Sequence, residues 1–384
     1  MDGLITKFVM PEVIFGNHSL KQVGESCLRL GAKKVLIVTD KGVMSVGWMD
    51  KVIESCQEAG LSYVYFHDIS TNPEESQAER GAQVYLENEC DAIIGVGGGS
   101  VIDIAKAIAI LATNGGKVSD YEGVDRIVVP LPPLVMAGTT AGSGAEVSQF
   151  SVIVDSERKK KMSIISKSLV PDIAIIDPVT LSTKSSHLTA STGLDVLTHA
   201  IEAYVSIAAT PMTDVFAKNA ITLVSENLRP SVASQLNSAA KNNMAMASLH
   251  AGLAFSNAIL GAVHAISHAI GGRYPMMHGD LNAVLLPHVM EFNLLANPDR
   301  FKEIAKLLGA NIAGLSTTEA GKRGIEHVKQ LSFEIGAPQR LSEMGFEEHM
   351  INEISQIALQ DACMITNPRD ITAQDVVKIL QRAL

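Results

Sequence analysis

The chain has 384 residues, of which 47% are hydrophobic and 19% are charged, and its formal net charge is −10. Its length is enough for two domains, since single domains usually contain about 100 to 200 residues. The acidic charge is spread along the chain and leaves no basic surface for a phosphate backbone, so nucleic acid is not an expected partner. The high apolar content indicates extensive burial, and we expect a homodimer or a higher homo-oligomer.

The chain termini and cysteines predict the compartment. The N-terminus, MDGLITKFVMPEVIFG, lacks the charged start, long apolar run and cleavage site of a signal peptide, and it alternates like a strand. The cysteines are far apart and form no CxxC pair, so we interpret them as reduced structural thiols. They are Cys27, Cys56, Cys90 and Cys363. We therefore expect a cytoplasmic protein.

In the first half of the chain, short β-branched runs alternate with helical stretches. This alternation is typical of βαβ units and a mostly parallel sheet, so residues 1–184 are predicted to form an α/β, Rossmann-like dinucleotide-binding domain. Two apolar runs on either side of a polar segment also predict a β-hairpin within 149–166. The predicted strands of the sheet are 34–39, 61–67, 92–96, 134–137 and 173–176.

In the second half, alanine, leucine, methionine and histidine dominate, which predicts an all-α domain over residues 185–384 that holds the metal and the catalytic groups. The boundary is expected within 178–186, with the active site in the cleft between the two domains. A glycine pair at 271–272 is expected to end one helix. The predicted helices are 187–205, 211–227, 239–257 and 262–270, followed by several more after residue 280.

One apolar stretch could be mistaken for a membrane span. Residues 242–272 contain no Asp, Glu, Lys or Arg, and the stretch is longer than the roughly 20 residues that cross a bilayer. It also carries the polar side chains of His250, Asn257, His264 and His268, which are costly in lipid. We interpret it as a buried helix or helix pair and expect no membrane partner.

Two loops of small residues predict a nucleotide site. The first, Gly95-Val-Gly97-Gly98-Gly99-Ser100, follows a predicted strand and opens a helix, where backbone N–H groups and the helix dipole attract a pyrophosphate. It lacks the full GxGxxG spacing, and a plain glycine turn is the alternative. The second, Gly138 to Glu146, follows another strand. Asp40 ends the strand 34–39, where its carboxylate would bond a ribose 2′-hydroxyl and favour NAD over NADP, or would only cap a helix.

Five candidate metal ligands lie on two predicted helices and in the turn after the second. Asp195 and His199 lie four residues apart and project from one face of a predicted helix, and His264 and His268 repeat this spacing. His278 follows shortly after. Such a set suits iron(II), zinc, cobalt or nickel better than calcium or magnesium, and with an open position it acts as a Lewis acid on an alcohol or carbonyl oxygen. Each histidine alone is more often a core residue, so the interpretation depends on the group.

Four segments follow one another in a recognisable order. They are Gly97-Gly-Gly-Ser-Val-Ile-Asp103-Ile-Ala-Lys106, Thr139-Thr-Ala-Gly-Ser-Gly-Ala-Glu146, Thr192-Gly-Leu-Asp195-Val-Leu-Thr-His199-Ala-Ile-Glu202-Ala-Tyr204, and the run from His264 through His268 to His278-Gly279. Together they resemble the iron-containing (group III) alcohol dehydrogenases. The resemblance implies a dehydroquinate synthase-like fold, NAD(H) and Fe²⁺ as cofactors, with Zn²⁺ as the alternative metal, a small alcohol or aldehyde substrate, and often a dimer.

The resemblance also assigns roles to matching positions. The metal would be held by Asp195, His199, His264 and His278, with His268 as the proton-transfer residue. The dinucleotide would lie among Asp40, Gly97, Gly98, Ser100, Asp103, Thr139, Thr140, Ser143, Val152, Lys161 and Leu181. The alcohol pocket would include Phe150, Val152 and Phe255. The loop reads Ser143-Gly144-Ala145 where many members have Thr-Gly-Ser, and Phe150 is bulkier than in some members, which affects substrate size.

The expected reaction passes a hydride between the alcohol carbon and the nicotinamide, while His268, with ribose hydroxyls and water, relays the hydroxyl proton. Two other enzyme functions are alternatives. One is a zinc-dependent, glycerol dehydrogenase-like polyol enzyme, and the other is a dehydroquinate synthase-like lyase. The lyase needs a polar, basic pocket, whereas the expected lining, which includes Met276, is mainly apolar. A non-enzymatic nucleotide-binding protein gives no reason to gather a carboxylate and histidines beside glycine loops.

Overall fold

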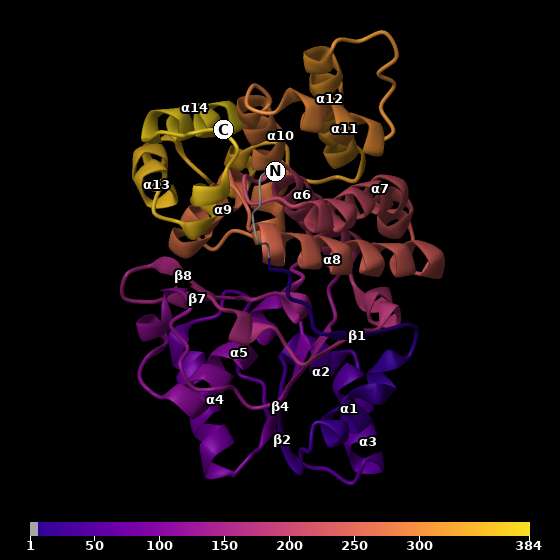
Figure 1. The fold of residues 1–384 in the computed structure, drawn as a ribbon, viewed down its shortest axis with the longest axis vertical. Coiled ribbons are helices and arrows are strands. Elements are labelled where there is room, and N and C mark those ends of the chain that lie inside the picture. Colours follow the sequence, from indigo (N-terminus) through magenta and orange to yellow (C-terminus); the bar gives the residue numbers. More distant parts are fainter. Residues whose placement is uncertain (1–6) are drawn as a thin grey trace. The chain divides into compact units, whose positions relative to one another are not determined.

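The computed structural model describes residues 7–384, which divide into two compact units, Val9–Lys184 and Ser185–Leu384 (Figure 1). Phe8 belongs with the second unit, where its ring stacks on Phe216 at a centroid distance of 5.6 Å. The strand expected near the N-terminus is β1, Glu12–Phe15. The part of that expectation that concerns residues 1–6 lies outside the described residues.

The first unit is built around a parallel six-stranded sheet with the order β1-β9-β6-β4-β2-β3. Its other strands are β2 (Lys34–Val38), β3 (Ser62–Phe66), β4 (Ala92–Gly97), β6 (Leu134–Gly138) and β9 (Ile173–Ile176). All five predicted strands are confirmed to within one residue at each end. Parallel strands leave their carboxyl ends at one edge, so the loops after β2, β4 and β6 are neighbours.

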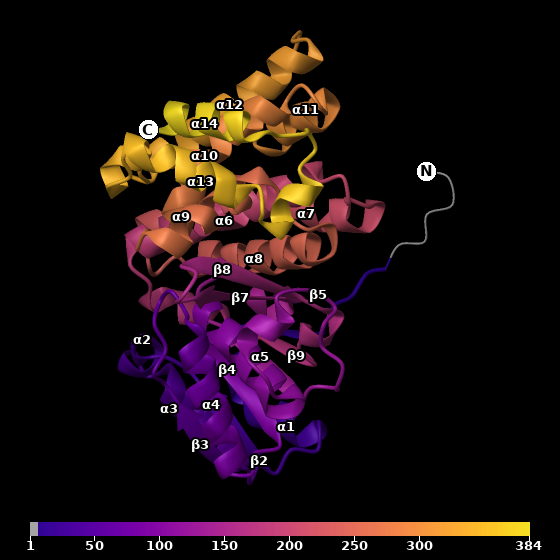
Figure 2. The same ribbon diagram turned by 90° about the vertical axis from the view of Figure 1, so that its left-hand side faces the viewer.

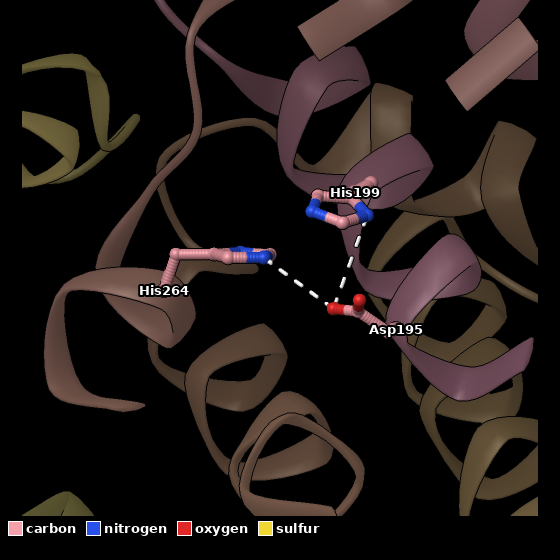
Figure 3. A group of neighbouring side chains, drawn as sticks. All are labelled: Asp195, His199 and His264. Atoms are coloured by element: carbon pink, nitrogen blue, oxygen red, sulfur yellow. Dashed lines mark ion pairs between the residues drawn. The ribbon is translucent and has the colours of Figure 1, made fainter. Parts of the chain in front are cut away.

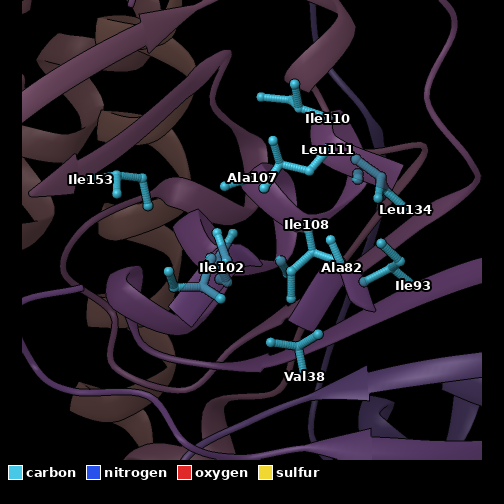
Figure 4. Close-up of a cluster of buried hydrophobic side chains, with 14 of the residues drawn as sticks. Val38, Ala82, Ile93, Ile102, Ala107, Ile108, Ile110, Leu111, Leu134 and Ile153 are labelled. Carbon is cyan, nitrogen blue, oxygen red and sulfur yellow. The ribbon is translucent and has the colours of Figure 1, made fainter. Parts of the chain in front are cut away.

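Helices cover both faces of this sheet. On one face lie α1 (Val23–Arg29) and α3 (Trp48–Glu58), and on the other lie α4 (Glu75–Glu87) and α5 (Gly99–Asn114) (Figure 1). Alternate residues of β2 therefore enter different clusters. Val35 and Ile37 pack with α1 and α3. Leu36 and Val38 pack with α4 and α5, in the cluster where Figure 4 labels Val38. Burial on both faces explains the continuous apolar runs of these strands.

The predicted hairpin is confirmed as β7 (Phe150–Asp155) and β8 (Lys160–Ile165), which pair antiparallel. Lys159, in the connecting turn, has a φ of 50°. The hairpin lies in its own three-stranded sheet, because the short strand β5 (Gly123–Val124) pairs parallel with β8. The two residues of β5 are too few to show a periodic pattern, and the sequence did not predict that strand.

The second unit is helical, as predicted (Figure 2). Helix α6 packs most extensively against α7, α8 and α10 and also contacts α11, so it lies at the centre of the unit. The helices are α6 (Ser186–Val205), α7 (Pro211–Ala233), α8 (Ser238–Ala258), α9 (Ala262–Arg273), α10 (His278–Asn293), α11 (Pro298–Leu307), α12 (Thr317–Glu334), α13 (Ile351–Ala358) and α14 (Ala373–Ala383). The expectation that the glycine pair 271–272 ends a helix is wrong, since α9 continues to Arg273, which forms an ion pair of 2.6 Å with Glu353. Packing of α9 on α13 outweighs the weak helix propensity of glycine there.

The apolar stretch 242–272 forms most of α8 and α9, two helices bent by 97° at a short break. At that break Ile259 adopts a φ of 61°. Most side chains of both helices are buried, as predicted. Among the described residues no single helix has the length and apolarity to cross a membrane, although the bent pair passes that test when its two members are taken together.

Gly279 allows α10 to approach α6 closely. A β-carbon at this position would lie 2.4 Å from the backbone oxygen of Ser191, far inside van der Waals contact. Ser191 is one turn before Asp195 on α6, and His278 precedes Gly279 at the start of α10. The missing side chain therefore brings the first turn of α10 against the turn of α6 that carries Asp195.

Candidate metal centre and nucleotide-binding loops

The four side chains assigned to the metal converge on one oxygen. Asp195 Oδ1 lies 3.9 Å from Nδ1 of His199, 3.6 Å from Nε2 of His264 and 3.7 Å from Nε2 of His278. Figure 3 shows Asp195 and His199 projecting from α6 toward His264 of α9. The side chain of His278 is 30% exposed, whereas the other three are buried. Three helices thus contribute to a single cluster.

These separations fit ligands around a shared cation better than hydrogen bonds. Protein hydrogen bonds rarely exceed about 3.2 Å between heavy atoms. Ligand atoms about 2.0–2.2 Å from an ion lie roughly 3.3–3.6 Å apart in a tetrahedral shell. The observed distances of 3.6–3.9 Å are a few tenths longer, so a small inward movement of the side chains suffices. One carboxylate and three imidazoles are also the donor set that suits iron(II) or zinc.

Glu202 fixes the orientation of one of these imidazoles. Its carboxylate is 2.6 Å from Nδ1 of His264 and accepts hydrogen bonds from the backbone amides of Gly261 and Val263. A proton held on Nδ1 by this carboxylate leaves Nε2 as the coordinating atom, a common arrangement around metal-binding histidines. Glu202 lies in the same motif as Asp195 and His199, but no role was predicted for it. Its place seven residues after Asp195 on the same helix is the signal that was missed.

The electrostatics of the cluster favour a positive charge. Burial raises the pKa of Asp195, but the neighbouring His199, His264 and His278 outweigh burial and hold that pKa well below its usual range. Burial lowers the pKa of His264, yet the carboxylates of Asp195 and Glu202 raise it to about 9. Without a metal, a second proton on the His264 ring gives it the positive charge that compensates the carboxylates of Asp195 and Glu202. A divalent cation meets the same requirement, so the residues fit the expected metal.

His268 lies beside the cluster with a different set of neighbours. Its Nδ1 is 2.9 Å from Oδ2 of Asp361, and its ring stacks on that of His278 at 5.4 Å. Cys363 is close enough for His268, Asp361 and Cys363 to surround an ion as well. However, 2.9 Å is an ordinary hydrogen-bond length, and burial raises the pKa of the Cys363 thiol well above its usual value, so the sulfur is a poor ligand. We interpret this group as a histidine oriented by an aspartate.

The two small-residue loops meet at the edge of the parallel sheet. Gly97 pairs with Gly138 across β4 and β6. A β-carbon added to Gly98 would lie 3.0 Å from Thr140, and one added to Gly99 would lie 2.9 Å from Ser143. Gly98 is the N-cap of α5 and provides no side-chain cap, which leaves the helix N-terminus available to an anion. The glycines thus let the two loops lie close together beside the N-terminus of α5, a position at which a phosphate group can bind.

A buried lysine joins the phosphate-binding helix to the second loop. Nζ of Lys106, on α5, donates hydrogen bonds to the backbone oxygens of Ala145, Ser148 and Phe150, at 2.7, 2.6 and 2.9 Å. Asp103, one turn earlier, accepts a hydrogen bond from the Val152 amide. Burial raises the pKa of Asp103, while Lys106 and Lys161 oppose that rise. Asp103, Val152 and Lys161 are therefore brought together on the hairpin side of α5.

The remaining predicted residues have varied surroundings. Asp40 caps α2 (Lys41–Ser45), since its Oδ1 accepts a 2.8 Å bond from the Val43 amide, so the alternative interpretation as a helix cap describes this oxygen. Leu181 and Phe150 are buried in the first unit. Phe255 is buried on α8, and its ring stacks on that of His199 at 4.5 Å. A contact of Asp40 with a ribose stays a prediction.

Comparison with known proteins agrees with this geometry. The sequence profile described as "Iron-containing alcohol dehydrogenase" matches residues 11–178, and that described as "Fe-containing alcohol dehydrogenase family, C-terminal" matches residues 189–384. The chain belongs to the iron-containing alcohol dehydrogenase family. It is therefore an oxidoreductase that acts on alcohols, as the motifs predicted.

Individual relatives of this alcohol dehydrogenase match it along nearly its whole length. It is 44% identical to the 1,3-propanediol dehydrogenase of Klebsiella pneumoniae over 98% of each chain. It is 43% identical to the NAD-dependent methanol dehydrogenase of Bacillus methanolicus over 98% of this chain and 99% of that one. A crystal structure of a 1,3-propanediol oxidoreductase superimposes with a TM-score of 0.97, at 43% identity, over 99% of this chain and 100% of the other. The fold class predicted from the sequence is thereby confirmed.

The contact of Glu202 with His264 predicts a loss of metal affinity when the carboxylate is neutralised. Glu202→Gln should weaken Co²⁺ binding to the metal-depleted protein by about 10- to 100-fold, as for other partners of metal-binding histidines. Competition with a chromophoric chelator measures this change. Glu226→Gln, which neutralises an exposed glutamate on α7, is the control. Equal affinities in the two variants would contradict the role given to Glu202.

The pKa of His264 predicts the pH dependence of metal binding. Because this pKa is raised to about 9 in the metal-free fold, the proton stabilises that fold fully below the ordinary value of 6.5, and this contribution is lost as the pH rises through about 9. A metal must displace the same proton, so Co²⁺ affinity should increase between pH 6.5 and 9. Chelator competition across this range measures the trend, and an affinity independent of pH would refute it.

Proposed function

We propose that this alcohol dehydrogenase interconverts a small primary alcohol and its aldehyde with NAD(H), and that Asp195, His199, His264 and His278 hold its divalent iron. The observation that carries the proposal is the convergence of these four side chains on one buried oxygen. The relatives named for propanediol and methanol support a small alcohol as substrate, and the name of the methanol enzyme supports NAD.

The chemistry divides between bound groups and side chains. Iron, when bound, supplies a Lewis acid that favours loss of the alcohol proton, and NAD⁺ supplies the hydride acceptor. Asp195 and the imidazoles fix the position of the positive charge, and burial keeps water from weakening it. The glycine loops and the N-terminus of α5 bind the pyrophosphate. Asp361 orients His268, which receives the hydroxyl proton during alcohol oxidation and returns it during aldehyde reduction.

The aromatic side chain beside the ligands limits the substrate. Phe255 stacks on His199, so a flat apolar surface borders the metal cluster within the second unit. An apolar border favours a short alkyl chain over a charged or heavily hydroxylated substrate. This preference argues against a dehydroquinate synthase-like lyase and is less favourable to a polyol than to a simple alcohol.

Metal loading and turnover test the proposal together. Protein purified without oxygen should contain about one equivalent of iron and should oxidise NADH with short-chain aldehydes such as propanal and 3-hydroxypropanal. Chelation should abolish turnover, because it removes the Lewis acid that favours loss of the alcohol proton, and reloading with Fe²⁺ should restore it. Elemental analysis and NADH absorbance are the measurements. Full activity in the metal-depleted protein, or none with any aldehyde in the iron-loaded one, would refute the proposal.

The position of His268 predicts a separation of metal binding from turnover. His268→Ala should keep its metal, because this ring bonds to Asp361 and the other four side chains form the cluster. Turnover should fall by about 10²- to 10⁴-fold, the usual contribution of a general acid or base. His250→Ala, which removes a histidine that bonds to Asn219 on α7, is the control. Loss of metal in His268→Ala would instead make His268 a ligand.

A further inference from the structure

A buried amide lies within the metal cluster and has no assigned role. Asn282 is on α10, one turn after His278, and is fully buried. Its Nδ2 is 2.8 Å from Oδ1 of Asp195 and 3.2 Å from Nε2 of both His264 and His278. The amide nitrogen thus touches three of the four side chains proposed to hold the metal.

The contact with Asp195 determines which end of the amide faces the cluster. A reversed amide would place its oxygen 2.8 Å from a carboxylate oxygen, and the two would repel each other. The nitrogen therefore faces Asp195 and donates a hydrogen bond. This contact is shorter than the three between Asp195 and the histidines, which measure 3.6–3.9 Å. Asn282 accordingly makes the shortest of these contacts and restrains the rotation of the Asp195 carboxylate.

The other end of the amide indicates that Asn282 is not there for stability alone. Its Oδ1 is buried without a hydrogen-bond partner among residues 7–384. An unsatisfied buried carbonyl is costly, and a leucine of similar size would avoid that cost. Asn293, eleven residues later on α10, offers a contrast: it is also buried, and its amide exchanges two hydrogen bonds with Asn367.

We propose that Asn282 is a positioning residue for the metal, and this inference rests on the proposed function. Its amide holds Oδ1 of Asp195 toward the three imidazoles before a metal arrives. A carboxylate oxygen has two lone pairs, so it can keep this hydrogen bond while it binds an ion. The amide has two N–H groups for three neighbours, so its longer contacts of 3.2 Å with His264 and His278 are the ones that a bound metal would replace.

The matched pair Asn282→Leu and Asn293→Leu tests this role in the full-length chain. Each removes a buried amide from α10, but only the first amide touches a proposed ligand. After chelator treatment, Asn282→Leu should bind Co²⁺ about 10- to 100-fold more weakly than the original chain. Asn293→Leu should lower the unfolding temperature of the metal-free protein and leave its Co²⁺ affinity unchanged. The visible absorption of bound Co²⁺, which reports the coordination geometry, should change only in the first variant.

The outcomes separate the role of Asn282 from the function of the enzyme. If Asn282→Leu has the same Co²⁺ affinity and the same Co²⁺ spectrum as the unaltered chain, the positioning role is overturned, even if that variant unfolds more easily. If the leucine variant does not fold, Asn282→Ala gives the same comparison in a smaller side chain. Failure of the unaltered chain to bind Co²⁺ would overturn both this inference and the proposed function. Tight Co²⁺ binding without alcohol turnover would count against the function alone.

Discussion

A single buried carboxylate imposes the main constraint on the second unit. An ionised group away from water is costly unless opposite charge or hydrogen bonds surround it. Asp195 meets this requirement with three imidazoles and one amide, contributed by α6, α9 and α10. These imidazoles in turn need partners, and the carboxylate of Glu202 bonds to His264. The neighbouring His268 is paired in the same way with Asp361. Interactions between charged and polar side chains therefore hold α6, α9 and α10 together, in addition to apolar packing.

The first unit contains a buried positive charge, which is also compensated by surrounding polar groups. The ammonium group of Lys106 is fully buried, and three backbone oxygens surround it. Those oxygens belong to the loop after β6 and the start of β7, whereas the lysine belongs to the helix that follows the glycines of β4. A side chain far from water thus ties together the two loops beside the N-terminus of α5.

Local patterns in the sequence were sufficient for the sheet and for part of the site. Strands buried on both faces produce continuous apolar runs, and the spacing of Asp195 and His199 places both on one side of α6. The partners of these residues were beyond that reasoning. Glu202 and His264 are 62 positions apart, and His268 and Asp361 are 93 apart, so nothing in the neighbouring sequence relates them. The prediction that Gly271 and Gly272 end a helix was wrong, because the packing of α9 outweighs the low helix propensity of glycine.

The absence of a side chain at Gly279 has a consequence for the choice of ion. Backbone of α10 rests almost directly on the carbonyl of Ser191, and main-chain atoms yield far less than flexible side chains do. The backbones of α6 and α10 consequently cannot come closer together near Asp195 and His278. The distance between the two backbones is fixed at this point, whereas the ligand side chains can still rotate. An ion of another radius therefore has to be accommodated by rotation of the ligand side chains, because the two backbones already lie in contact.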